Sequence, residues 1–154
     1  MTTIFTIGHS NHEPDAFLEL LHENGIGAVA DVRSSPYSRY VPQANRETLA
    51  RALQSAGIAY HWFGDRLGGK PDGIVADYDQ LRSSPGFQQG LGDLLILAEK
   101  DPTAIMCSEG DHTECHRHKL ITPALLDRNV DVYHIQPDGQ LIHENKEPRQ
   151  LSLF

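Results

Sequence analysis

The sequence has few cysteines, no long apolar run and no excess of basic residues, and each shortage excludes a class of protein. Two cysteines in 154 residues are too few for a disulfide-stabilised scaffold, so we expect a reducing, cytoplasmic setting. No apolar run approaches the roughly 20 residues that span a membrane. The first residues lack a basic segment followed by an apolar core, so no signal peptide is predicted.

The charge balance is acidic, with a formal net charge of −8 when the histidines are neutral. Proteins that bind nucleic acid over a broad face usually present a basic surface, so direct binding of that kind is not predicted. The acidic charge is compatible with a local basic pocket, or with a protein partner that supplies the DNA contact. The negative charge is also accounted for by solubility alone.

Short apolar β-type runs alternate along the chain with segments of helical periodicity. This alternation predicts an α/β domain over residues 1–143, with a mostly parallel sheet and helices on both faces. A turn at residues 137–139 predicts a C-terminal hairpin, and residues 144–154 are predicted to form a polar linker and a flexible tail. The strands are expected at residues 3–7, 26–32, 58–63, 104–107, 131–135 and 141–143.

Glycine and proline set the expected limits of the helices. One helix is predicted from Pro14 to a C-cap at Gly25, a second from an N-cap at Asn45 to Gly57, and a third from Ser84. Pro123 predicts a kink or an interruption in the last helix. Residues 64–80, rich in glycine, are predicted to be a long irregular insertion, such as a binding loop or a lid.

Chemically active side chains occur where four of the predicted strands end. The carboxyl ends of parallel strands share one edge of the sheet, where α/β proteins usually bind ligands. Residues far apart in the sequence are therefore expected to line one crevice. They are His9, Ser10, Asp31, Arg33, His61, Cys107 and Glu109.

Both cysteines fall between Cys107 and Arg117, after a strand and before a predicted helix. The positive end of that helix favours a thiolate at Cys115, suited to act as a nucleophile, a metal ligand or a redox partner of Cys107. Buried, inert thiols are the alternative. The spacing of Cys107, His112, Cys115 and His116 matches no standard zinc pattern, so no metal site is predicted.

The arginines and histidines suggest how a substrate is held and how protons move. Arg33 and Arg117 are predicted to bind an anionic group, although a salt bridge to Asp31 or Glu109 would also explain Arg117. We predict catalytic roles for His9, Asp31, Glu109, Cys107 and Cys115, and substrate binding by Ser10, Arg33, His61, Gly68, Gly69, His116 and Arg117. A structural role remains the alternative for each histidine and glycine. The sequence identifies no cofactor, since it has no Walker or Gly-x-Gly-x-x-Gly pattern.

Four blocks of sequence together resemble domain-of-unknown-function family 488 (DUF488). The blocks are residues 6–10, residues 31–33, residues 67–69, and Cys107 and Glu109 followed by residues 115–117. The resemblance extends from residue 4 to about residue 135. It implies that His9, Ser10, Asp31, Arg33, Cys107, Glu109, Cys115, His116 and Arg117 occupy motif positions of the family, and it implies no reaction.

The last five residues, Gln150, Leu151, Ser152, Leu153 and Phe154, are similar to the peptide by which bacterial replication and repair proteins bind the β sliding clamp. In that mode a glutamine anchors the peptide, and leucine and phenylalanine fill an apolar pocket. An apolar tail packed on its own domain is the alternative. We therefore expect an enzyme acting on an anionic, phosphate-bearing substrate near replicating or repaired DNA, or a non-catalytic anion- or nucleotide-binding module tethered to the clamp.

Overall fold

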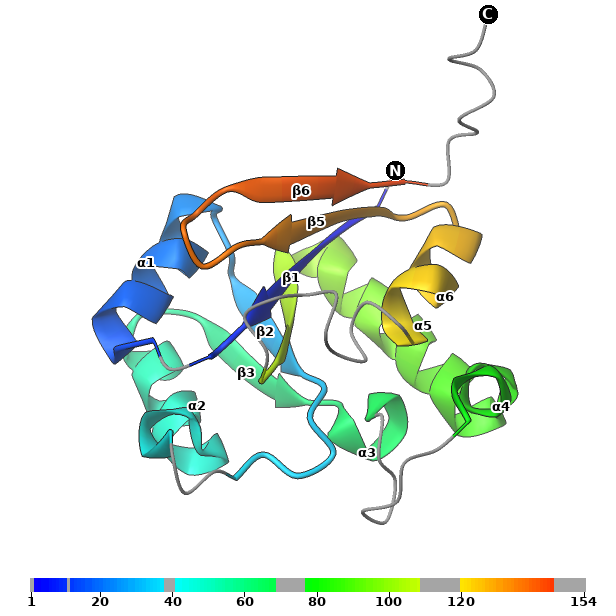
Figure 1. Cartoon of the computed structure of the whole chain (residues 1–154), viewed down its shortest axis with the longest axis horizontal. Helices are drawn as coiled ribbons and strands as arrows, with labels where there is room; N and C mark the ends of the chain where they lie inside the picture. The colour runs from blue at the N-terminus through cyan, green and yellow to red at the C-terminus, as the bar shows by residue number, and fades with distance from the viewer. Residues whose placement is uncertain (1, 11, 38–40, 69–76, 109–119, 146–154) are drawn as a thin grey trace, which may run out of the picture.

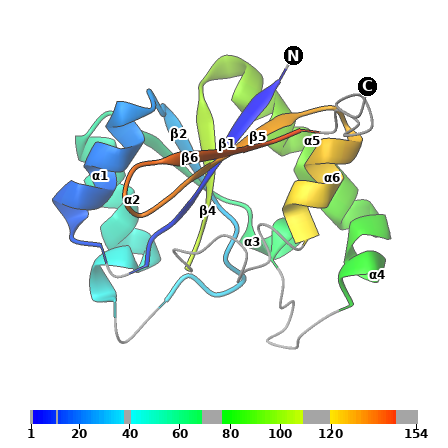
Figure 2. The same ribbon diagram turned by 45° about the horizontal axis from the view of Figure 1, so that its top comes forward.

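The computed structural model describes residues 2–10, 12–37, 41–68, 77–108 and 120–145, and these form a six-stranded sheet with helices on both faces (Figures 1 and 2). The strand order is β3-β2-β4-β1-β5-β6, and every pair is parallel except β5 with β6. The predicted fold, including the C-terminal hairpin, is confirmed. In chain order the elements are β1 (Thr3–Gly8), α1 (Pro14–Glu23), β2 (Ala28–Asp31), the 3-10 helix η1 (Pro42–Ala44), α2 (Arg46–Ser55), β3 (Ala59–Trp62), α3 (Gly64–Leu67), α4 (Tyr78–Ser83), α5 (Pro85–Lys100), β4 (Thr103–Cys107), α6 (Thr122–Asp127), β5 (Asp131–Ile135) and β6 (Leu141–Glu144).

Two apolar cores lie on the two faces of the sheet. Helices α1 and α2 cover one face, where Phe17 and Leu53 pack on strand residues such as Val29. Helices α3, α5 and α6 cover the other face, where Leu91 and Leu125 pack on β1, β2, β4 and β5. Strands β2 and β4 are buried along their whole length, as central parallel strands are when both faces are covered.

The helices begin and end close to the proline, glycine and capping residues that predicted their limits. Pro14 stands in the first turn of α1, and Gly25, two residues after its end, has a φ of 66° that favours glycine. Asn45 is the N-cap of α2 as predicted, but its side chain makes no capping hydrogen bond. The chain passes from a π-helical turn at residues 120–121 into α6 directly before Pro123, which agrees with the expected interruption.

The prediction of an irregular insertion over residues 64–80 is wrong at both ends. Residues 64–67 form α3, and α4 begins at Tyr78 with the Asp77 side chain accepting a hydrogen bond from the Asp79 backbone N–H at 2.9 Å. The short α3 is held by tertiary packing, because the close approach of Gly90 in α5 leaves room for Arg66 and Leu67. Residues 69–76 lie outside the described part of the chain.

The topology places a switch point between β1 and β4. The chain leaves β1 through α1 toward β2, and leaves β4 through α6 toward β5, so the two connections run to opposite sides of the sheet. In open α/β sheets such a point leaves a crevice at the carboxyl ends of the strands. Among the described residues, no helix is both long enough and apolar enough to cross a membrane.

Candidate active site at the carboxyl ends of β1, β2 and β4

Backbone hydrogen bonds continue beyond the strands and bring three strand ends together. The N–H of His9 donates to the carbonyl of Cys107, and the N–H of Ser10 donates to the carbonyl of Ser108, each at 2.8 Å. On the other side of β4, the N–H of Val32 donates to the Met106 carbonyl at 3.0 Å. The segment after β4 therefore starts between the residues that follow β1 and those that follow β2.

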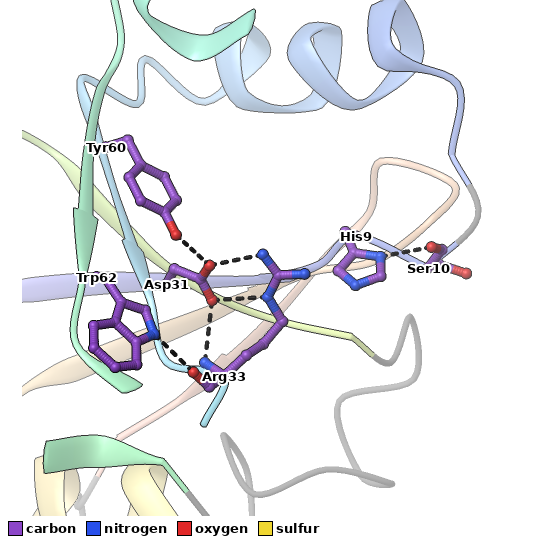
Figure 3. A network of polar contacts seen from close by, with 6 residues as sticks. All are labelled: His9, Ser10, Asp31, Arg33, Tyr60 and Trp62. Carbon is purple, nitrogen blue, oxygen red and sulfur yellow. Dashed lines mark hydrogen bonds and ion pairs between the residues drawn. The ribbon is translucent and has the colours of Figure 1, made fainter. Parts of the chain in front are cut away.

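A buried ion pair joins Arg33 to Asp31 at the end of β2 (Figure 3). Arg33 donates from Nε to Oδ1 at 2.9 Å and from Nη2 to Oδ2 at 2.7 Å, which is the bidentate geometry that orients a guanidinium most firmly. The backbone N–H of Arg33 also donates to Oδ1, at 3.1 Å. Asp31 is fully buried and Arg33 is 5% exposed, so each charge depends on the other for compensation.

Two aromatic residues of β3 hold this ion pair from the side. The Tyr60 hydroxyl donates to Asp31 Oδ2 at 2.6 Å, and the Trp62 indole N–H donates to the Arg33 carbonyl at 2.9 Å. Burial, followed by the hydrogen bond to Asp31, raises the pKa of Tyr60 well above its ordinary value of 10, so the phenol keeps its proton. The Arg46 guanidinium lies 4.7 Å from the centre of the Trp62 ring.

His9 is the second buried polar group of the site, with only 6% of its surface exposed. Its Nδ1 lies 2.7 Å from the carbonyl oxygen of Ser10. Because a carbonyl can only accept, Nδ1 carries the proton and Nε2 of the neutral ring is a hydrogen-bond acceptor. Nε2 is buried and has no hydrogen-bond partner within the described residues. Ser10 holds this arrangement with a left-handed φ of 47°, a conformation that costs free energy in a residue other than glycine.

The environment of His9 favours the neutral imidazole. Burial is the main cause that lowers its pKa below 6.5, and the Arg33 charge adds to it, while the hydrogen bond to Ser10 and the Asp31 charge act in the opposite direction. In Figure 3 the guanidinium nitrogen that Asp31 does not bind points toward the His9 ring. The site therefore pairs a fixed donor, Arg33 Nη1, with a neutral base.

The lowered pKa of His9 predicts a pH-dependent contribution to stability. Below about pH 6.5 the unfolded chain protonates this histidine while the folded chain resists it, so the parent should lose stability as pH falls through that window. His9→Gln removes this contribution. The free energy of unfolding, measured in urea from about pH 7.5 to about pH 5.5, should fall more steeply for the parent than for the variant. Parallel curves would show that His9 titrates alike in both states.

The remaining predicted residues within the described chain lie apart from this pair. Cys107 is 1% exposed and packs in the core under α5 and α6, whereas Tyr60 packs toward α1 and α2. His61 is exposed and alternates with Tyr60 and Trp62 along β3, so it lies on the opposite face of that strand. At Gly68 an added Cβ would overlap the Ser34 hydroxyl and the Gly64 carbonyl, so this glycine allows close packing within the protein.

Gly69, Glu109, Cys115, His116 and Arg117 lie outside the described residues, as do the tail residues 150–154. Within the part that is described, no group of three or more His, Cys, Asp or Glu side chains is arranged to hold a metal ion. Residues 109–119 begin directly after Ser108, whose carbonyl binds the backbone of Ser10.

Sequence reasoning missed three residues that shape the site: Tyr60, Trp62 and Gly64. A signal was present, since two aromatic residues with polar tips occur at alternate positions of a predicted strand, which places them on one face. No local pattern marks Gly64. Its importance comes from the Arg33 carbonyl and the Trp62 indole, which a Cβ at this position would overlap or closely approach.

Comparison with known proteins gives one match. A family model covers residues 13–122, a segment that includes β2, β3, β4 and the stretch after Cys107 but not His9 and Ser10. No curated protein and no solved structure matches the chain. Because the family model covers more than half of its length, the chain belongs to the family described as "Domain of unknown function DUF488".

Proposed function

We propose that the protein is an enzyme that acts on a small anionic, phosphate-bearing substrate at the carboxyl ends of β1, β2 and β4. The observation that carries the proposal is the buried neutral imidazole of His9, whose Nε2 has no partner among the described residues and which lies beside a firmly oriented arginine. A buried polar atom without a partner costs free energy, so such atoms are concentrated at functional sites.

In this proposal His9 is the general base. Its Nε2 accepts a proton from the attacking group, and the Ser10 carbonyl, through Nδ1–H, keeps the ring in the required tautomer. A base whose pKa is lowered below 6.5 is mostly unprotonated at physiological pH, so most of the enzyme is in the active, neutral form.

Arg33 is the proposed donor to the anion. Its Nε and Nη2 are bound to Asp31, which leaves Nη1, the nitrogen that points toward His9. Since the pair with Asp31 is electrically neutral overall, a second cation would strengthen anion binding, and Arg117 is the candidate. Asp31 and Tyr60 are positioning residues, because Asp31 is fully buried and both of its oxygens are engaged.

Cys115 is the proposed nucleophile: its sulfur bonds to phosphorus while the P–O bond to the leaving group breaks, and Glu109, in the same segment as His116, protonates the departing oxygen. Water then cleaves the S–P bond and releases inorganic phosphate. Cys107 is a poorer candidate than Cys115, because its side chain is 1% exposed and lies within an apolar core. Iodoacetamide labelling of the parent and of Cys115→Ser distinguishes the two thiols. Fast labelling that Cys115→Ser removes supports the assignment, and a chain with two slow thiols favours the alternative, a non-catalytic anion- or nucleotide-binding module.

The test uses inorganic phosphate for binding and 4-nitrophenyl phosphate for turnover. Trp62 is the only tryptophan and binds the Arg33 carbonyl, so its fluorescence should report occupancy of the site. His9→Gln should retain phosphate binding and lower kcat by about 10²- to 10⁴-fold, the usual effect of losing a general base. Cys115→Ser should abolish turnover. Phosphate binding without turnover in the parent would favour the binding module, and no binding would contradict both.

We also propose that the tail docks the protein on a β sliding clamp through Gln150, Leu151, Ser152, Leu153 and Phe154. The support is the likeness of these residues to clamp-binding peptides and their place after a polar segment that contains Pro148. Deletion of residues 150–154 should remove association with purified clamp in a pull-down, while the phosphate titration stays unchanged. Association that survives the deletion would contradict tail docking.

A further inference from the structure

An apolar pocket lies beside His9, between α1, η1 and α2. Its cavity volume is about 50 Å³. Phe17 and Leu49 form buried parts of its wall, and Pro14 and Thr48 are exposed residues on its lining. The Gln43 side chain lines it as well and donates to the His12 carbonyl at 3.1 Å, which ties η1 to the segment after β1.

The pocket and the proposed active site have His9 in common. His9 lines the pocket, and the charges of Arg33 and Asp31 act on the same imidazole. Figure 3 shows the Arg33 guanidinium on one side of this ring. A ligand that reaches both places would therefore have a polar end at Arg33 and a second group among α1 and α2.

The walls determine the chemistry of that second group. Most of the lining residues are apolar: Pro14, Phe17, Leu18, Ala44, Leu49 and Ala52. A nucleobase would lose the hydration of several donors and acceptors here and recover few hydrogen bonds, which is costly. A hydrocarbon group gains free energy from the same walls. With one water needing about 10–15 Å³ on this measure, the volume suits roughly three to five carbon atoms.

We propose that this pocket binds a short aliphatic group of the substrate, so that the substrate is an alkyl phosphate rather than a nucleotide. The inference deepens the proposed function and rests on it. The phosphate lies at Arg33 Nη1, and the alkyl chain extends past His9 between α1 and α2.

A series of alkyl phosphates tests the pocket. Binding of inorganic phosphate, methyl, propyl, pentyl and octyl phosphate is measured by Trp62 fluorescence and calorimetry. Affinity should rise by about fourfold per methylene group, up to roughly five carbons, and then level off. Ala52→Leu, which places extra carbon atoms in the pocket, should abolish the rise and leave inorganic phosphate binding unchanged. Gln54→Leu makes a comparable addition on the exposed side of α2 and should keep the rise.

Two results would overturn the inference while the proposed function stands: phosphate binding without a gain from the alkyl chain, or a gain that Ala52→Leu does not reduce. If no phosphate compound binds, the proposed function fails. Binding of a hydrocarbon group in the pocket is then tested separately with neutral 1-butanol. Shifts of the Phe17 and Leu49 NMR signals that Ala52→Leu removes would support an apolar subsite. Absence of those shifts in the parent would overturn it, and this measurement needs no variant to fold.

Discussion

Gly64→Ala is expected to destabilise the protein by roughly 3 kcal/mol or more, at the upper end of the cost of overpacking. The added Cβ would overlap the carbonyl oxygen of Arg33 and lie 2.5 Å from Trp62 Nε1. These atoms belong to the backbone and to a ring that are hydrogen-bonded to each other, so neither can move without breaking that bond. The variant should also lose phosphate affinity, because Arg33 would shift.

The matched control is Gly86→Ala, in the first turn of α5. An added Cβ there meets no atom within 4 Å, and alanine is the better helix former, so this variant should be neutral or more stable by about 0.5 kcal/mol. Urea unfolding followed by Trp62 fluorescence and by circular dichroism measures both. A Gly64→Ala variant as stable as Gly86→Ala would show that the Arg33 backbone is not held as described.

Arg33→Met should cost roughly 3–5 kcal/mol, the usual result of removing one partner from a buried ion pair. The Asp31 carboxylate would stay fully buried, with the Tyr60 hydroxyl and the backbone N–H of residue 33 as remaining donors. Neither donor carries the compensating charge. The free energy of unfolding from urea titration at neutral pH measures the loss.

A second variant separates loss of charge compensation from loss of packing. Asp31→Leu combined with Arg33→Met removes both charges and should be more stable than Arg33→Met alone by about 2 kcal/mol, although Tyr60 then lacks its acceptor. The partly exposed pair of Arg82 with Asp79 is the surface control, and Arg82→Met should change stability by less than about 1 kcal/mol. A double variant no better than Arg33→Met would point to packing as the cause.

The fold was predictable because its signals are local. Short apolar runs such as residues 26–32 are typical of a central parallel strand, and glycines such as Gly25 and Gly57 mark helix ends through their positive φ. The same reasoning failed at residues 64–67, where α3 is too short to be stable alone and forms by packing against α5. The glycines of this segment suggested a loop, but Gly64 instead allows the start of α3 to approach the backbone of Arg33 closely.

The candidate site was predictable only in its location. Knowing that parallel strands end at one edge was enough to group His9, Ser10, Asp31 and Arg33, and their adjacency is observed. The same rule also included His61 and Cys107, whose side chains lie elsewhere. A strand end determines which edge a residue reaches, whereas the direction of its side chain depends on the pleat and on the helices packed above it.

By itself, the sequence determined the class of fold, the strands and their order along the chain, and the edge of the sheet where reactive residues gather, because hydrophobic periodicity and the positions of glycine and proline are properties of neighbouring residues. Only the tertiary structure decided that Asp31 binds the Arg33 guanidinium and Trp62 its carbonyl, that His9 keeps a buried acceptor atom, and that an apolar pocket is lined by His9. Burial, charge compensation and cavity shape arise between elements distant in the chain, so no stretch of residues encodes them alone.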